Sequence, residues 1–384
     1  MDLHFTEEQE MIREVAREIA VEKIRPVAAE HDESGEFPHD LMKVIAEGDL
    51  FRVFIDEKYG GMGMGTLALS IAIEELTWGC AGISIGYAAT ALGAFPIIIH
   101  GSEEQKVKFL PLIADGKLAA FGLTESGAGS DASAVKTTAV RDGDHYVING
   151  TKQWITNGGE AEIYSIIAST NSSKGTRGLS AFVVEKGTEG FDFGKKEDKL
   201  GIRASATREL VFKDCRIPAE NLIGKEGRGF KVAMDTFDAS RAGIGAQAVG
   251  IAQAALDYAV EFAYEREQFG QKITAFQGIR FMIADMATQI EAARALVYKA
   301  AFMYDDNDKR SGTFSCMAKL FASDVAMQVA VDAVQIYGGN GYMKEYPVEK
   351  LMRDAKITQI YEGTNQIQRD IIGRDVVKNI VRNK

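Results

Sequence analysis

One carboxylate near the C-terminal end of the sequence could act as a base. Glu362 lies in the stretch Ile360–Gln366, directly before Gly363 and Thr364. Glycine allows positive φ and lets a ligand approach the backbone, so a carboxylate held here could take a proton from a ligand beside it. A solvated acid at a helix end, with Gly363 as the stop, explains the same residues. On this stretch alone, the helix end is the simpler interpretation.

Two further stretches could hold a flat or charged ligand. In Phe121–Asp131, Gly127 and Gly129 expose backbone N–H groups among hydroxyl side chains, which suits a phosphate or the polar edge of a planar ring. The glycines alone favour an ordinary turn. In Trp154–Gly159, the indole could stack on a flat cofactor while Thr156 bonds its edge. A core tryptophan at a strand end is about equally consistent with this stretch.

A third stretch, Gln335–Tyr342, interrupts a helical pattern with three glycines. Each glycine in a helix costs about 1 kcal/mol relative to alanine. We therefore expect a reason beyond packing, such as close approach of a ligand or a neighbouring chain.

Helical periodicity marks both ends of the chain. Thr6–Gln9 is a capping box, the apolar residues from Met11 to Ala20 recur at helical spacing, and Pro26 should kink or end this helix. The later helices are long and rich in alanine, with apolar residues on more than one face. This predicts a four-helix bundle that other subunits can also cover. The predicted helices are Leu41–Glu47, Thr66–Trp78, Glu103–Ile113, Ala242–Tyr264, Phe281–Tyr304 and Phe314–Tyr337.

The middle of the chain has the pattern of a β domain of about a hundred residues. Its segments are short and rich in β-branched or aromatic residues, with turn signals at Asp142-Gly143 and Asn149-Gly150. The predicted strands are Val135–Arg141, His145–Asn149, Ile163–Ser169, Leu179–Lys186 and Glu209–Asp214. We therefore expect an α+β chain with domains at residues 1–117, 118–226 and 227–384.

Composition and charge restrict the function. With 384 residues, two or three structural units are expected, and 46% apolar and 26% charged residues are typical of a soluble globular protein. A net charge of −11 argues against nucleic-acid and acidic-lipid partners. Cys80, Cys215 and Cys316 lie far apart and read as buried or incidental thiols of a reducing compartment. The five histidines have no metal-ligand spacing, so neither a metal site nor Ser–His or Cys–His chemistry is expected.

Neither a nucleotide loop nor a targeting segment is predicted. The loop Tyr59–Gly65 lacks the third glycine of GxGxxG, and no Walker A sequence is present. Met1–Phe5 has neither a basic nor an apolar region of a signal peptide, and we expect no apolar window of 18 residues. The chain is therefore expected to be cytoplasmic, without membrane contact.

Taken together, these stretches resemble the signatures of the acyl-CoA dehydrogenase family over essentially the whole chain. Gly122–Ala134 is similar to the first signature, and Gln335–Asp354 to the second, with the glycines, Lys350 and Asp354 in place. Two long signatures in the right order are specific. Asp354–Gln366 is similar to the short-chain, butyryl-CoA-type branch, including enzymes of anaerobic bacteria. The resemblance implies a helical N-terminal domain, a β-barrel-like middle domain and a C-terminal four-helix bundle.

The resemblance also implies an FAD between the β domain and the C-terminal helices. Its implied contacts are Phe121, Leu123, Thr124, Gly129, Ser130, Trp154, Ile155, Thr156, Thr364 and Gln366. A second group would reach the FAD of a neighbouring subunit: Arg266, Gln268, Phe269, Phe276, Gln277, Gln335, Gly338 and Gly339. The fork of Arg266 can bind phosphate oxygens, although a solvated helix end explains it too. Such composite sites imply a homotetramer, a dimer of dimers.

For the acyl-CoA, the resemblance implies contacts at Ser130, Phe237, Asp238, Arg241, Tyr361 and Gly363. Asp238 and Arg241 could equally form a structural ion pair. In the isovaleryl and long-chain branches the base is a glutamate directly before this arginine, where this chain has Ser240. The base must then be Glu362.

The implied reaction is removal of the α-proton by Glu362 while a hydride leaves the β-carbon for flavin N5. The thioester oxygen would be bonded by the Glu362 backbone N–H and an FAD ribityl hydroxyl, as in an oxyanion hole. Burial by the ligand would raise the pKa of Glu362. Electrons would pass to an electron-transferring flavoprotein.

The substrate is open at this point. Gly82–Phe95, similar to the helix that lines the acyl pocket, carries no charge, which favours an apolar tail and gives no arginine for a distal carboxylate. Its small residues could leave room for a branched, cyclic or aryl group, or simply permit close packing. A short straight chain is the first choice. The same fold could run as an enoyl-CoA reductase; an oxidase, usually a longer chain, or a non-catalytic scaffold fits less well.

Overall fold

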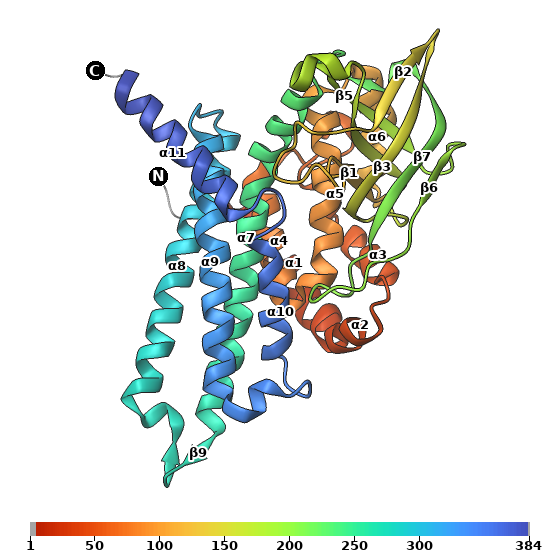
Figure 1. Cartoon of the computed structure of the whole chain (residues 1–384). Coiled ribbons are helices and arrows are strands. Elements are labelled where there is room, and N and C mark those ends of the chain that lie inside the picture. Colours follow the sequence, from red (N-terminus) through yellow and green to blue (C-terminus); the bar gives the residue numbers. More distant parts are fainter. Residues whose placement is uncertain (1–4, 383–384) are drawn as a thin grey trace.

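The computed structural model describes residues 5–382. Met1–His4, on which part of the signal-peptide prediction rests, lie outside this range. Helices occupy both ends of the described chain and one sheet occupies the middle, as predicted (Figure 1).

The first helix begins and is interrupted where the sequence predicts. In α1 (Glu7–Ile19), Thr6 accepts from Gln9 N at 3.2 Å and its own N–H donates to the Gln9 side chain at 3.1 Å. A π turn, Ala20–Ile24, and a 3₁₀ turn containing Pro26 follow before the chain continues as α2 (Ala28–Ser34). The proline lacks the N–H that a continuous helix would need.

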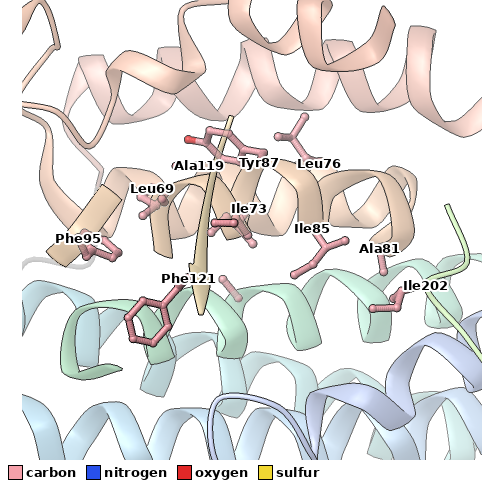
Figure 2. Packing of buried hydrophobic residues seen from close by; sticks show 14 of the residues in the cluster. Leu69, Ile73, Leu76, Ala81, Ile85, Tyr87, Phe95, Ala119, Phe121 and Ile202 are labelled. Atoms are coloured by element: carbon pink, nitrogen blue, oxygen red, sulfur yellow. The ribbon is translucent and has the colours of Figure 1, made fainter. Parts of the chain in front are cut away.

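Four further helices complete the N-terminal part: α3 (His39–Glu47), α4 (Gly65–Gly79), α5 (Ala81–His100) and α6 (Glu103–Ala114). Both α4 and α5 are apolar on nearly every face because other elements cover them on several sides. Figure 2 shows Ile73 of α4, Ile85 of α5 and Phe121 in one cluster of buried side chains.

Two helical segments are long and apolar enough to cross a membrane by length and composition, Ala81–His100 and Ser311–Tyr342. This corrects the prediction that no such window exists. Their windows are 83% and 56% buried inside the protein, and core helices of soluble proteins pass the same test, so the finding is weak evidence for a span.

The barrel-like middle domain is an eight-stranded sheet in the order β6-β7-β3-β2-β4-β5-β8, with β1 paired to β4. Its strands are β1 (Ala119–Gly122), β2 (Thr138–Asp142), β3 (His145–Thr156), β4 (Ile163–Ser169), β5 (Leu179–Glu185), β6 (Phe191–Phe193), β7 (Thr207–Pro218) and β8 (Leu222–Ile223). The short strands β1, β6 and β8 were not predicted.

One predicted turn is wrong. Asp142-Gly143 does connect β2 to β3, but Asn149-Gly150 lies inside β3. The register between β3 and β7 shifts there, between Ile148 and Gly150, so this glycine forms a bulge within a long strand.

The C-terminal helices form the bundle at the left of Figure 1: α7 (Gly229–Glu265), α8 (Gln277–Asp305), α9 (Ser311–Tyr337), α10 (Val348–Thr358) and α11 (Asn365–Arg382). A small hairpin of β9 (Glu267–Gln268) and β10 (Gln271–Lys272) joins α7 to α8 at the lower end. The helix that the glycines of Gln335–Tyr342 interrupt ends at Tyr337, where Gly338 takes a φ of 60°.

Candidate active site

The base predicted from the sequence lies in the loop between α10 and α11. Glu362 has a φ of 49° and Gly363 a φ of 92°. A left-handed conformation is costly for a residue with a side chain and persists only where its surroundings hold it. Here Gln368 Nε2 donates to the carbonyl oxygens of Glu362 at 3.1 Å and Gly363 at 2.9 Å, and Arg241 Nε approaches Glu362 O at 3.4 Å.

The carboxylate of Glu362 turns toward α7, where Ser240 Oγ donates to its Oε2 at 2.5 Å. Burial raises the pKa of Glu362, while the hydroxyl of Ser240 and the charges of Arg241 and Lys319 favour its ionised form. Glu362 is therefore a half-buried acid whose carboxylate is held in one place. The interpretation as a freely solvated acid is wrong because Ser240 holds the carboxylate, although a helix does end just before this loop.

The neighbouring turn of α7 brings the base toward the β domain. The ring of Phe237 meets the edge of Phe121 at 5.7 Å between centroids. One turn further, Arg241 is buried and pairs with Asp238 at 3.4 Å. The structural ion pair considered from the sequence is thus present, and a contact of either residue with a substrate stays a prediction.

The glycine-rich loop and the tryptophan stretch lie side by side. The N–H of Gln153 donates to Thr124 O at 2.8 Å, which joins β3 to the loop. Trp154 sits in a second register shift of β3, with a φ of 58°, and 58% of it is exposed. The alternative of a core tryptophan is therefore wrong. Bulges that turn a side chain outward recur beside functional sites.

A buried ion pair between Lys152 and Glu125 holds the glycine-rich loop Phe121–Asp131 in place. Lys152 Nζ bonds Glu125 at 2.7 Å and Leu123 O at 3.2 Å, and Glu125 also accepts from the backbone N–H groups of Lys136 and Thr137. Burial lowers the pKa of Lys152 to about 8, and Glu125 opposes that shift. The charged residues of the loop are thus used internally, and its glycines are left for a ligand.

The residues of this region fit a flat anionic cofactor such as FAD. A side chain built on Gly127 or Gly129 would meet nothing within 4 Å, so the loop opens onto free space. The exposed indole of Trp154 offers a face for stacking. By contrast, Phe121, Leu123 and Ile155 are buried, so their backbone is better placed than their side chains for contact with a ligand.

The second group of predicted FAD residues lies at the C-terminal end of α7, away from the Glu362 loop. From Arg241 to Glu265, α7 is about 36 Å long at the helical rise of about 1.5 Å per residue. Arg266 is therefore far from the Glu362 loop of its own chain. The second glycine stretch lies beside this end of α7, because Tyr337 stacks on Phe262 at 4.1 Å. Several of these residues are exposed: Arg266, Gln268, Phe269, Gln277, Gln335, Gly338 and Gly339.

Tyr361, predicted to contact the substrate, bonds a residue that the sequence did not point to. Its hydroxyl donates to the amide oxygen of Gln247 on α7. Gln247 is fully buried, and among residues 5–382 its Nε2 has no hydrogen-bond partner. Of the remaining predicted residues, Ser130 and Gln366 are exposed, while Thr364 is half-buried and accepts from Ile367 N at 3.4 Å.

Three residues that contact the Glu362 loop were not singled out as doing so: Ser240, Lys319 and Gln368. Ser240 was considered only because it replaces another possible base. Lys319 carried one usable signal, since this lysine lies within a helix that is otherwise mostly apolar.

The comparisons with known proteins agree over the full length. Three acyl-CoA dehydrogenase family domains match: the N-terminal domain at residues 6–117, the middle domain at 120–215 and the C-terminal domain at 227–377. The chain is 49% identical to a short-chain-specific acyl-CoA dehydrogenase of Clostridium acetobutylicum, covering 98% of this chain and 100% of the relative. It is also 49% identical to an acryloyl-CoA reductase (NADH) of Anaerotignum propionicum, covering 98% and 96%.

A solved structure of butyryl-CoA dehydrogenase from Megasphaera elsdenii superimposes with a TM-score of 0.96 at 48% identity, covering 98% of this chain and 100% of the other. The three family domains occupy most of the chain, and these relatives match it from end to end. The chain therefore belongs to the acyl-CoA dehydrogenase family.

Proposed function

We propose that this protein catalyses the FAD-dependent α,β-dehydrogenation of a short-chain acyl-CoA to the trans-2-enoyl-CoA, with Glu362 as the base. The observation that carries the assignment of the base is the half-buried, left-handed Glu362, whose carboxylate is fixed by Ser240 at 2.5 Å. A raised pKa suits a base that must take a proton from carbon and still be ionised near neutral pH.

The loop can also stabilise the charge that develops on the substrate. Among residues 5–382, no acceptor is found for the backbone N–H of Glu362. This donor can bind the thioester oxygen as the α-proton leaves, and a fixed donor aimed at developing charge lowers the barrier. FAD, when bound, accepts the hydride that leaves the β-carbon. Phe121–Ser130, Trp154–Thr156 and Thr364–Gln366 are the segments that would hold it.

A short, straight acyl group fits the surroundings best. No residue of Gly82–Phe95, within α5, is charged, so a distal carboxylate would find no partner there. A side chain built on Gly93 would lie 2.5 Å from Ala120 N of β1, so this glycine serves the close packing of α5 against β1. The short-chain-specific relative supports the same substrate class.

The reductive direction is the second candidate. The relative named as an acryloyl-CoA reductase is as similar as the short-chain dehydrogenase. The same residues would then return a proton from Glu362 to the α-carbon. Redox potentials and partners set the direction.

We further propose a homotetramer in the cytoplasm that exchanges electrons with an electron-transferring flavoprotein. Arg266 and the adjacent Phe269, which is 93% exposed, lie too far from their own Glu362 loop and would serve the FAD of another subunit. Large apolar side chains on the outer faces of α8 and α9 support subunit contacts: Phe281, Phe302 and Phe321.

An anaerobic titration tests the proposal. Wild-type protein, Glu362→Gln and Glu345→Gln, in which an exposed carboxylate is neutralised, are mixed with straight, branched, cyclic and aryl acyl-CoA thioesters while FAD absorbance is followed. Butyryl-CoA should bleach wild type and Glu345→Gln. Glu362→Gln should keep FAD and bind the thioester, yet bleach at least about 100-fold more slowly. Normal bleaching by this variant would overturn the assignment of the base.

A further inference from the structure

A lysine that forms no ion pair with another of residues 5–382 is buried next to the loop that carries Glu362. Lys319 of α9 is fully buried. Its Nζ donates to Gly363 O at 2.9 Å and to Asn365 Oδ1 at 2.9 Å. Among residues 5–382, no carboxylate lies within 4.0 Å of it. An ammonium is costly to bury without a partner, so its position calls for an explanation.

The same face of α9 fastens both ends of the base loop. Asn365, just after the loop, donates to Ser323 Oγ at 2.9 Å and to Asp324 Oδ1 at 2.8 Å. Gln359, just before it, donates to the same Asp324 oxygen at 2.7 Å. Lys319 adds the only contact from α9 to a carbonyl inside the loop, within residues 5–382. The loop is thus held at its two ends and at its centre.

The central contact lies next to the strained residue. Gly363 comes directly after Glu362. The direction of the Gly363 carbonyl depends on the left-handed conformation of Glu362 and Gly363. Loss of a donor there would free the loop to relax to an ordinary helix end, in which Glu362 points elsewhere.

We propose that Lys319 is a positioning residue for Glu362. The ammonium of Lys319 fixes the Gly363 carbonyl and favours the ionised form of the base. The proposal rests on the proposed role of Glu362 in proton removal. Lys319 acts through the loop and its charge, without touching the substrate.

The charges around the two groups agree with this role. Glu362 faces Ser240 and Arg241 on α7, Lys319 on α9 and the neutral Gln368 on α11. Lys319 faces Glu362, Arg241, Asp324 and Cys316. Burial lowers the pKa of Lys319 to about 7 and raises that of Glu362, and each group partly opposes the shift of the other. Removing the ammonium must therefore raise the pKa of Glu362 further.

Two substitutions separate the charge from the hydrogen bond. Lys319→Gln keeps a donor near Gly363 O and loses the charge, whereas Lys319→Met loses both. Ser323→Ala is the matched control, because it removes an uncharged member of the same cluster. All are studied as holoenzymes, with retained FAD absorbance as the check on folding.

The first readout is the pH dependence of the rate of flavin reduction by butyryl-CoA in single turnover. Both Lys319 variants should shift the midpoint upward by about 1 pH unit, as loss of a nearby opposite charge does. Lys319→Met should also lower the rate at the high-pH plateau, since the loop loses its central donor. Ser323→Ala should keep the wild-type midpoint. An unchanged kinetic midpoint in Lys319→Gln would contradict the proposal unless the infrared measurement below shows a shifted pKa of Glu362, and Lys319→Gln serves as the test if Lys319→Met does not fold.

The second readout does not depend on catalysis. Difference infrared spectra without substrate follow the carboxyl band that disappears in Glu362→Gln, and so report the pKa of Glu362 directly. The same upward shift in Lys319→Gln is expected, and no shift would overturn the proposal. If the infrared midpoint moves while the kinetic midpoint does not, Lys319 does tune Glu362, and it is the assignment of Glu362 as the base that fails.

Discussion

Replacement of Ser240 by alanine gives a direct measure of how the protein tunes its base. The hydroxyl of Ser240 donates to Glu362 Oε2 at 2.5 Å, and Ser240 is buried. A hydrogen bond to a charged group contributes about 1.5–3 kcal/mol. Since 1.36 kcal/mol corresponds to one pKa unit, its loss should raise the pKa of Glu362 by about 1–2 units.

The sign follows from which form the hydroxyl stabilises. Ser240 favours the ionised carboxylate, so it lowers a pKa that burial has raised. The base must be ionised to take the α-proton, so the rate of flavin reduction is full above this pKa and falls as the pH decreases through it. In Ser240→Ala the fall should begin about 1–2 pH units higher, with little change at the high-pH plateau.

The assay is stopped-flow reduction by butyryl-CoA across the pH range under anaerobic conditions. Ser240→Thr keeps a hydroxyl and should remain near wild type. Ser315→Ala removes another buried hydroxyl, which donates to Asp238 O at 3.0 Å and does not contact Glu362, so its midpoint should not move. A downward shift in Ser240→Ala would refute the reasoning, because the hydroxyl would then be accepting a hydrogen bond from protonated Glu362.

Three further substitutions test the cofactor region. Lys152→Met should leave Glu125 as an unpaired buried charge and cost about 3 kcal/mol, seen as a lower unfolding midpoint in urea, whereas the paired change Lys152→Met with Glu125→Gln should recover part of the loss. Trp154→Ala should weaken FAD binding about 2–10-fold in a fluorescence titration of the apoprotein, and Trp154→Phe much less, since only a stacking face is removed. Arg266→Ala should weaken FAD binding at least about tenfold without lowering the rate of reduction at saturating FAD; an equal loss of that rate would argue against its place at another subunit's pyrophosphate.

The sequence predicted most helices because their signals are local. The capping box at Thr6 and the long apolar periods of α7–α9 need no tertiary information. The bulge at Gly150 could not be predicted in this way, because Asn-Gly has the same local preference in a hairpin turn. Pairing with β7 decides between the two, and pairing partners lie far apart in the sequence.

In the candidate site, too, local motifs could be predicted from the sequence, whereas features that depend on tertiary packing could not. Glu362 and Gly363 came from a resemblance between short motifs, while the alternative of a solvated helix end depended on burial, which a motif does not contain. The sequence left a stacking residue and a core residue equally open for Trp154, and the register shift in β3 decides between them by turning it outward. Lys319 lies 43 positions before Glu362 and within an apolar helix, so its contact with the base loop becomes visible only when α9 packs against that loop.

The state of the base depends on a balance that no single element supplies. Burial raises the pKa of Glu362 and so favours its protonated form, which cannot remove an α-proton. The opposing groups come from two helices: Ser240 and Arg241 from α7, and Lys319 from α9. A loop that followed α10 without these helices would relax to a solvated helix end. The packing of α7 against α9 is therefore what converts this carboxylate from a surface acid into a base, and a change that separates the two helices should lower activity even if every residue of the loop is retained.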